Sequence, residues 1–337
     1  MVVLMRRAAA VLMVCMSATA LRLQMSATAS TPGARNPAMQ DFSLDSVRKS
    51  LIRQEETIIF AMIERAQFGV NSAIYQPTSK ETWDADGSQV DPWLLEKGGS
   101  FLCFMLLETE KVHARARRYL SPEETAFFPE QIKMPPVLEP LEYPQVLQGE
   151  REININDVVM KVYKEQLVPA ICAPGDDQQH GSSALCDIAC LQALSRRIHI
   201  GKFVAESKYQ QMPDKFTELV QARDIAGINE LLTNVLVEER VCNRARLKAV
   251  SFGQEAFSDA EAGFKVDPNV MYSIYRDMII PLTKQVQVRY LFERVKTAGG
   301  GDYEEITDDE WPANLLAWGG KEEMVAAPPI QGKGLFL

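Results

Sequence analysis

Apolar residues along most of this chain recur every three to four positions, which is the spacing of one face of an α-helix. The alternation expected of a half-buried strand is scarce. Helices are predicted from Phe42 onward and over residues 101–119, 156–169, 195–209, 224–248 and 267–295. The last of these begins at the cap Asp267 and the first-turn Pro268, and Pro281 inside it predicts a kink. The pattern therefore predicts an all-α protein.

The segments between these helices are rich in proline and glycine. Residues 69–99 look irregular, and residues 127–155 predict an extended segment that wraps across a helical surface. Three glycines at 299–301 end the helical pattern. The sequence contains no internal repeat and no glycine-rich phosphate loop. We expect one multi-helix domain over residues 41–296 and a C-terminal extension of unknown role over residues 297–337.

Residues 1–40 differ in composition and contain no aspartate or glutamate. Arg6 and Arg7 precede a short apolar run over residues 8–16, which cannot span a bilayer, and small residues follow. This start is typical of a signal peptide, and the hydroxyl-rich continuation is typical of a transit peptide. Together they predict a targeting leader for the plastid stroma, with no membrane segment in the mature form. Secretion, a single organellar presequence and a cytosolic location after processing are the alternatives.

The composition is that of a globular protein, with 46% hydrophobic and 24% charged residues among 337. The formal net charge of -9 argues against binding of nucleic acid. Six cysteines form no CxxC pair, and only three histidines are present. Cys186 and Cys190 are four residues apart, but no second ligand pair accompanies them. The pattern indicates buried reduced thiols rather than a zinc site, and no metal is predicted.

Two cations in the predicted helix over residues 195–209 suggest a site. Arg197 and Lys208 are eleven residues apart, which is about three helical turns, so both lie on one face. The same face carries apolar neighbours such as Val204, and cations beside an apolar groove suit a compact anion. Other helices add two polar pairs at a spacing of four, Asn234 with Glu238 and Thr283 with Gln287, and a single cation, Arg48.

Each of these features also has an interpretation without a site. A solvated pair explains Arg196 and Arg197, and an exposed helix face explains Asn234 with Glu238. Thr283 is also explained as a partner for the backbone groups that Pro281 frees. Spacing alone leaves both interpretations open.

Longer motifs favour the site. The chain resembles the eukaryotic chorismate mutases, the all-helical class of fungi and plants, over about residues 42–296. The motifs that carry the resemblance are RQEETIIF (53–60), SPEETAFFP (121–129), CLQALSRRIH (190–199), GKFVAE (201–206) and PLTK (281–284). Runs of this length do not arise from helical propensity alone.

The resemblance implies the rearrangement of chorismate to prephenate on the way to phenylalanine and tyrosine. This Claisen rearrangement needs no metal and no cofactor. The enzyme must hold a flexible dicarboxylate in its reactive chair and stabilise charge along the breaking C–O bond. By matching position, Arg48 and Arg197 are expected to bind the two carboxylates, and Lys208 the ether oxygen.

The resemblance also implies roles for the two polar pairs. Glu238 is expected to accept from the ring hydroxyl, with Asn234 and Thr283 as supporting contacts. Gln287 is expected to donate its amide to the ether oxygen, whereas the fungal enzymes have glutamate at this position. A glutamate there helps only when it is protonated, while an amide donates at every relevant pH. We therefore expect activity to be nearly flat from mildly acidic to mildly alkaline pH.

Regulation is a further expectation from the resemblance, because members of this size are usually homodimers that respond to tyrosine, phenylalanine or tryptophan. The matching effector positions are Arg117 and Arg118 for a carboxylate, and Gly181 and Ser182, in a predicted loop, for an ammonium group. Leu185 replaces a threonine typical of the fungal enzymes, and because leucine can neither donate nor accept, we expect one effector contact to be absent. A solvated basic helix end and a plain turn explain the same residues without an effector.

Two other functions compete with a plastid mutase. The first is a helical regulatory or interaction protein that has lost catalysis, and the presence of Arg48, Arg197 and Lys208 argues against it. The second is a secreted mutase, which differs only in its destination. The continuation of the leader beyond its signal-like part favours the plastid.

Overall fold

The computed structural model describes residues 44–78, 92–97, 99–139, 141, 143–149, 153–253, 263–301, 303–304, 306–312 and 315. They all belong to one compact unit, Ser43–Leu337. The predicted leader over residues 1–40 lies outside the described residues.

Helices account for the regular structure of the described residues, so the predicted all-α class is confirmed. The longer helices are α3 (Leu44–Arg65), α6 (Phe101–Arg115), α9 (His180–His199), α10 (Gly201–Gln211), α13 (Val235–Gly253) and α15 (Ile280–Thr297). The shorter ones are α5 (Pro92–Glu96), α7 (Asn156–Val162), α8 (Val168–Ile171), α11 (Pro213–Gln221), α12 (Ile225–Leu232) and α14 (Pro268–Ile274). Single turns are η1 (Ser72–Tyr75), η2 (Arg118–Leu120) and η6 (Asp308–Glu310), and π-helical segments are η4 (Tyr163–Leu167) and η5 (Tyr275–Ile279).

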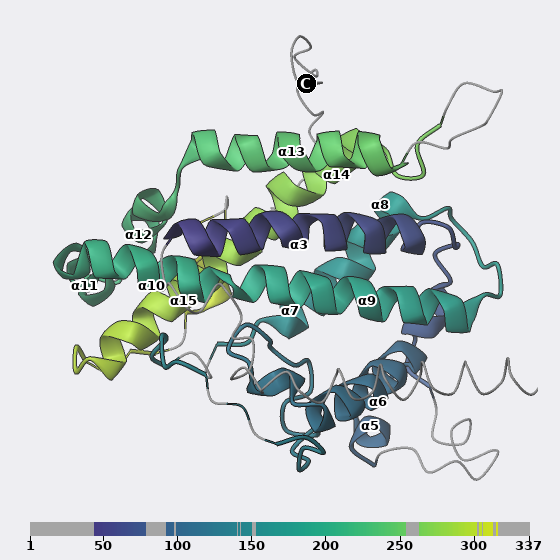
Figure 1. Ribbon diagram of the computed structural model, residues 1–337, viewed down its shortest axis with the longest axis horizontal. Coiled ribbons are helices and arrows are strands. Elements are labelled where there is room, and N and C mark those ends of the chain that lie inside the picture. Colours follow the sequence, from purple (N-terminus) through teal and green to yellow (C-terminus); the bar gives the residue numbers. More distant parts are fainter. Residues whose placement is uncertain are drawn as a thin grey trace, which may run out of the picture. The chain divides into compact units, whose positions relative to one another are not determined.

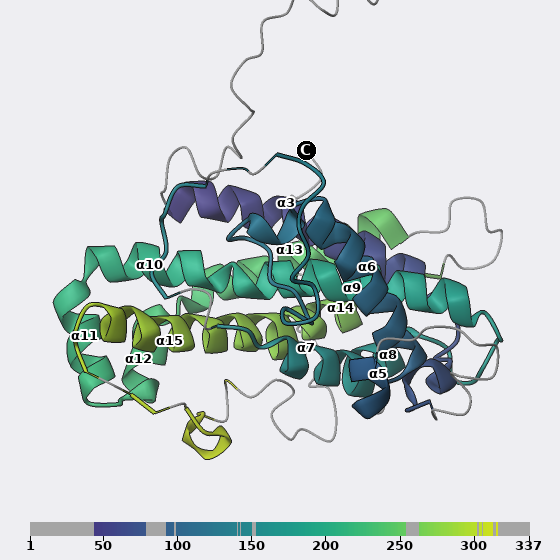
Figure 2. The same ribbon diagram turned by 90° about the horizontal axis from the view of Figure 1, so that it is seen from below.

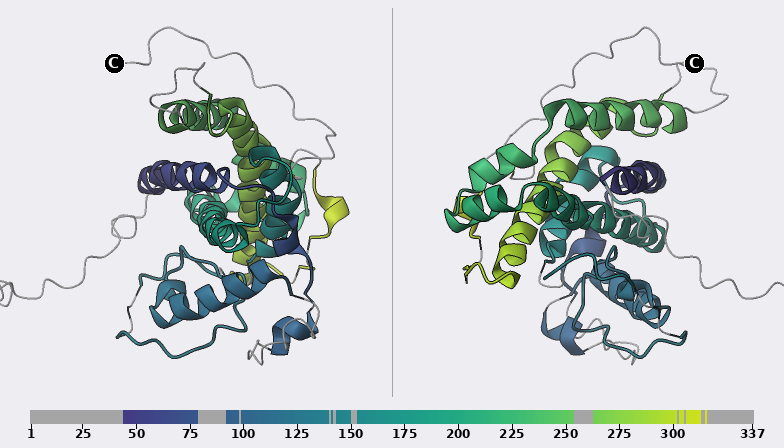
Figure 3. Two further views of the ribbon diagram at one scale, coloured as in Figure 1. Left: turned by 90° about the vertical axis from the view of Figure 1, so that its right-hand side faces the viewer. Right: turned by 60° about the vertical axis from the view of Figure 1, so that its left-hand side comes forward.

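Three rows of helices lie side by side in the order α13, α3 and α9–α10, and α14–α15 crosses behind them (Figure 1). Helix α15 packs along α10 and also contacts α9, α11 and α12. Figure 3 shows α6 and the segment that follows it on the side of α9 away from α13. The elements that carry the predicted catalytic residues therefore all border α15 or its neighbours.

The first three turns of helix α15 are buried on nearly every side. Leu282, Val286 and Leu291 have no exposed surface. Four polar side chains on the same helix are nevertheless only 5–8% exposed: Thr283, Lys284, Gln285 and Gln287. A fully buried helix is ordinarily apolar, and each buried polar group costs free energy unless it has a partner. This helix therefore carries several buried polar groups that need partners.

The predicted helix over residues 195–209 is divided between α9 and α10. Ile200 joins them with helical backbone angles (φ -62°, ψ -13°), so the two helices continue in nearly one direction, as Figure 1 shows. A Cβ atom on Gly201 would lie 2.7 Å from the carbonyl oxygen of Thr283. Glycine therefore allows α10 to approach α15 more closely than a larger residue would.

The prediction of one helix over residues 224–248 was wrong. Asp224 caps α12 by accepting from the Gly227 amide at 2.8 Å. Thr233 then has extended angles (φ -82°, ψ 132°), and the Asn234 side chain accepts from the Val237 amide at 3.1 Å to start α13. Thr233 and Asn234 separate the two helices without interrupting the apolar spacing, so periodicity alone does not reveal the break.

The other helix ends follow from local chemistry. Helix α6 stops at Arg115, earlier than predicted, because Arg117 takes a left-handed conformation (φ 69°). Asp267 caps α14 as predicted and accepts from the Asn269 amide at 2.8 Å. Pro281 occupies the first turn of α15 directly after the π-helical η5, so its missing N–H is accommodated where the helix changes its winding.

Candidate active site

Side chains from α9, α10, the α12–α13 junction and α15 meet in one cluster. Arg197 Nη1 donates to Thr283 Oγ1 at 3.4 Å. Lys284 Nζ lies 2.9 Å from Glu238 Oε1 and 2.9 Å from Thr233 Oγ1. Lys208 donates to the carbonyl oxygen of Leu232 at the end of α12. Residues more than eighty positions apart in the sequence, such as Arg197 and Thr283, thus lie together in this cluster.

Arg197 is the most deeply buried cation of this cluster and is only 5% exposed. Burial lowers the pKa of its guanidinium. Its Nε has no hydrogen-bond partner, and within the described part of the chain no carboxylate lies within 4.0 Å of it. A buried guanidinium without an anion is costly, so its environment suits a negatively charged ligand.

Lys208 lies in a positive environment. Burial is the main cause that lowers its pKa, and the charges of Lys284 and Arg48 act in the same direction. Glu238 opposes them. Arg48 on α3 is therefore electrostatically coupled to the cluster, although its side chain is exposed. One carboxylate among several cations leaves an excess of positive charge, which a dicarboxylate would neutralise.

A second ion pair influences Arg197 electrostatically. Glu55 on α3 is fully buried and accepts two hydrogen bonds from Arg244 on α13, at 2.6 and 2.7 Å. Its charge raises the pKa of Arg197, as does the neighbouring Tyr275. Tyr275 is fully buried in η5, and its hydroxyl has no hydrogen-bond partner among the described residues. The Glu55 carboxylate therefore favours the charged form of Arg197 although no ion pair joins the two among the described residues.

The cluster contains most of the predicted residues. Gln287 lies one turn beyond Thr283 and donates to its carbonyl oxygen at 3.3 Å. Asn234 is exposed, and its side-chain oxygen caps α13, so its supporting contact stays a prediction. Lys284 was missed, although it directly follows Thr283. The sequence had already indicated Thr283 as a site residue, but only the fold shows that the adjacent Lys284 points toward Glu238.

The predicted effector residues form two separate groups. Arg118 donates to Glu124 at 3.1 Å and to Gln192 on α9 at 2.9 Å, while Arg117 donates to the carbonyl oxygen of Glu139. Gly181 and Ser182 lie in the first turn of α9, so the prediction of a loop was wrong. The free amides of a first helical turn suit a carboxylate better than an ammonium group.

Arg118, which contacts Gln192, and Gly181 are too far apart within one chain to bind the same amino acid. Gly181 and Gln192 are separated by eleven residues of α9, which is about 16 Å along the helix axis. The carboxylate and ammonium of an amino acid are attached to the same carbon.

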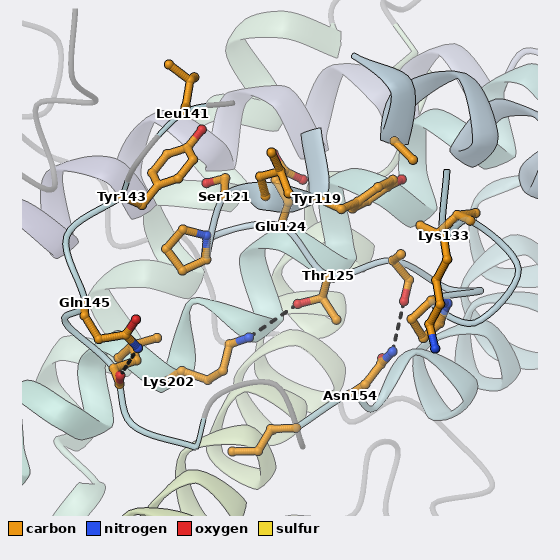
Figure 4. A pocket seen from close by; sticks show the side chains of 18 of the residues that line it. Tyr119, Ser121, Glu124, Thr125, Lys133, Leu141, Tyr143, Gln145, Asn154 and Lys202 are labelled. Atoms are coloured by element: carbon orange, nitrogen blue, oxygen red, sulfur yellow. Dashed lines mark hydrogen bonds between the residues drawn. The ribbon is translucent and has the colours of Figure 1, made fainter. Parts of the chain in front are cut away.

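A groove of about 990 Å³ lies apart from these residues, beneath the extended segment that follows α6 (Figure 4). Tyr119, Tyr143 and Lys202 are among its lining residues, and Lys202 donates to Thr125 at 3.4 Å. None of the predicted catalytic residues lines it. Among the described residues no group of three histidine, cysteine, aspartate or glutamate side chains is placed to hold a metal ion.

Comparison with known proteins identifies the family. A family model described as "Chorismate mutase type II" matches residues 180–288. The curated "Chorismate mutase 1, chloroplastic" of Petunia hybrida is 41% identical over 281 residues, which cover 81% of this chain and 83% of the relative. The "Chorismate mutase" of Emericella nidulans is 40% identical and covers 77% and 95% of the two chains. The chain belongs to the chorismate mutase family. It is an enzyme of the eukaryotic type, and the rearrangement of chorismate to prephenate is its reaction.

Solved chorismate mutases share the fold. The chloroplast chorismate mutase from Zea mays is 41% identical, with a TM-score of 0.67 over 78% of this chain and 98% of its own. A Candida albicans chorismate mutase in complex with L-Trp is 39% identical, with a TM-score of 0.68 over 76% and 93%. About a fifth of this chain therefore lies outside each match, although the solved chains are matched over nearly their whole length. No helix among the described residues is long and apolar enough to cross a membrane.

Proposed function

We propose that the cluster around Arg197 holds chorismate in its reactive chair and carries the rearrangement. Bonds form and break within one molecule, so positioning and charge stabilisation are the available sources of catalysis. Arg48 and Arg197 bind the two carboxylates. Lys208 donates to the ether oxygen, which gains negative charge as the C–O bond breaks.

The remaining polar groups complete the substrate contacts. Glu238 accepts from the ring hydroxyl, and Lys284 holds that carboxylate in place through their ion pair at 2.9 Å. The Gln287 amide donates to the ether oxygen beside Lys208. Thr283 and Asn234 are supporting contacts, and the Thr283 hydroxyl donates to the carbonyl oxygen of Ile279 at 2.6 Å.

The main support for this proposal is that Arg197 is buried without a carboxylate partner among the described residues. Its neighbour Arg196 provides the contrast, because Arg196 Nη2 pairs with Glu123 at 2.6 Å and its side chain is 35% exposed. Two adjacent arginines thus have different environments, and only Arg197 is placed for a ligand.

The two arginines offer a matched experiment. Arg197→Ala should lower kcat/KM roughly 30-fold to 5,000-fold, because a buried charge pair with the substrate is lost. This factor corresponds to about 2–5 kcal/mol of lost transition-state stabilisation. Arg197→Lys should recover only part of the activity, since lysine lacks the bidentate fork. Arg196→Lys is the control and should leave kcat/KM within about threefold of the parent. Equal effects of the two lysine variants would contradict the assignment.

We further propose that aromatic amino acids regulate this enzyme at an interface between two copies of the chain. AtCM1 has been solved with tyrosine and with phenylalanine bound in its allosteric site, and the Candida albicans enzyme with L-Trp. The separation of Arg117 and Arg118 from Gly181 supports a two-chain site. In the proposed homodimer, the first turn of α9 from one copy and the arginines of the other both bind the carboxylate of the effector.

Regulation is tested by measuring kcat and half-saturation with and without tyrosine, phenylalanine and tryptophan, together with the molecular mass in solution. We expect a dimer, and a change in half-saturation with at least one amino acid. Arg117→Gln should abolish that change, while Arg115→Gln, an exposed arginine at the end of α6, should not. A monomer, or no response to any of the three, would contradict this proposal.

We propose the plastid stroma as the location of the mature enzyme. The composition of residues 1–40 supports this, as do the chloroplastic relatives of Petunia hybrida, Arabidopsis thaliana and Zea mays. A fluorescent reporter fused to residues 1–40 should accumulate in the plastid. Secretion of the reporter, or its retention in the cytosol, would contradict the proposal.

A further inference from the structure

The C-terminal extension packs against α15. Trp311 is 5% exposed, and Leu315 has no exposed surface. The guanidinium of Arg289 lies 5.3 Å from the centre of the Trp311 ring, and Gln285 Nε2 donates to the carbonyl oxygen of Leu315 at 2.7 Å. Figure 2 shows the extension turning back after α15 and running beside it. The described part of this extension is thus a docked element of the domain.

The extension contacts the face of α15 opposite to the catalytic face. At about 100° per residue, Thr283 and Gln287 point in nearly the same direction, and Gln285 points roughly 180° away from their mean. Arg289 lies near Gln285 on this projection. The same buried helix is therefore held by the active-site cluster on one side and by the extension on the other.

The extension also binds the turn between α11 and α12. Arg223 in this turn has a left-handed conformation (φ 55°), and its guanidinium lies 2.5 Å and 3.0 Å from the carboxylate oxygens of Glu310. It also donates to the carbonyl oxygen of Glu304 at 3.2 Å. A bidentate arginine–carboxylate pair fixes orientation as well as distance.

Helix α12 leads from this turn directly to the active site. Its last residue, Leu232, accepts the hydrogen bond of Lys208, and the following Thr233 accepts that of Lys284 at 2.9 Å. Through Glu310 the extension therefore holds the helix that orients these two lysines. Through Gln285 it holds the helix that carries Lys284 and Gln287.

We propose that residues 303–304, 306–312 and 315 form a strap that ties α12 to α15 and so positions the catalytic lysines and Gln287. Gln285, Arg223 and Glu310 act as positioning residues, because their side chains contact the strap or its partners rather than substrate. This inference rests on the proposed function of the Arg197 cluster. It gives the C-terminal extension a role in catalysis that the active-site residues alone do not reveal.

Point variants test the strap in the full-length enzyme. Glu310→Gln and Gln285→Ala should each raise KM for chorismate about threefold to tenfold and lower kcat, because displaced catalytic groups bind the reactive chair less well. Asp309→Asn is the matched control, since Asp309 is exposed and adjacent to Glu310. It should leave both constants unchanged. The double variant Arg223→Glu with Glu310→Arg restores the ion pair in reverse and should recover most of the loss.

A purely stabilising extension gives a different result. In that case the variants lower Tm, but kcat and KM measured well below Tm equal those of the parent, and the proposal is overturned. Amide hydrogen exchange provides a readout that does not depend on activity. Glu310→Gln should speed exchange at the α12 and α15 amides relative to Asp309→Asn, and equal exchange would overturn the strap. If the parent enzyme did not consume chorismate, the proposed function of the Arg197 cluster would be wrong. The exchange measurement would still show whether the extension holds α12 and α15.

Discussion

Replacing Gln287 by glutamate tests how this site stabilises charge. Gln287 is 6% exposed on α15, in the cluster that contains Lys208 and Arg197. Its neutral amide donates a hydrogen bond whatever the pH. A glutamate of nearly the same shape donates only while protonated, and once ionised it repels the negative charge that develops on the ether oxygen.

The size of the effect follows from burial. Burial raises the pKa of Glu110 in this chain, although three groups donate hydrogen bonds to its carboxylate. The neighbouring cations act in the opposite direction on a carboxyl at position 287. We take a pKa of about 6, within the range observed for buried glutamates. At pH 8 about one molecule in 100 then holds the proton, which corresponds to about 2.7 kcal/mol of lost transition-state stabilisation.

The assay is loss of chorismate by ultraviolet absorbance, with kcat/KM measured from pH 5 to pH 9. The parent should vary little up to mildly alkaline pH. Gln287→Glu should approach the parent within about threefold at pH 5 and fall about 100-fold below it at pH 8. Gln287→Met is the control, because it lacks the donor but does not titrate. It should lower kcat/KM without adding an acidic optimum.

One result would refute this reasoning. If Gln287→Glu were as active as the parent at pH 8, the residue would not donate to the ether oxygen, and its role would have to be sought elsewhere. A uniform loss at every pH, matching that of Gln287→Met, would also contradict the electrostatic argument.

Three further outcomes follow from the structure. Gly201→Ala should lower kcat/KM more than tenfold, because the new Cβ would lie 2.7 Å from the Thr283 carbonyl oxygen and displace that turn of α15. The loss in free energy of unfolding should be smaller than this loss of transition-state stabilisation. An unchanged kcat/KM would contradict the prediction. Asp187→Asn should lower the free energy of unfolding, measured by urea titration, by about 3–5 kcal/mol. The substitution leaves the fully buried Arg65, whose Nε lies 2.5 Å from Asp187 Oδ1, without a counter-charge. A loss under about 1 kcal/mol would show that the pair contributes little. The pKa of Lys208 is lowered by burial, so kcat/KM should begin to fall at a pH below the ordinary lysine value of 10.5 as its proton is lost; a profile flat to that pH would refute its role as a charged donor.

Local patterns determined much of the architecture. Helical periodicity predicted the all-α class, and the cap at Asp267 was recognised from neighbouring residues alone. These features depend on interactions within a few residues, which is why the sequence reveals them. The predicted helix over residues 224–248 was wrong at its interruption, because Thr233 leaves the helical region while the apolar spacing continues on both sides.

The sequence by itself determined the family and the residue types of the site: the cations Arg197 and Lys208, and the amide of Gln287 in place of glutamate. Only the tertiary structure decided which of these are buried without a carboxylate, that Lys284 points toward Glu238, and that the extension docks through Trp311. The physical reason is that burial and charge pairing depend on helices far apart in the chain. The sequence specifies the chemical group, and its neighbours in space set its pKa, its partners and its access to a ligand.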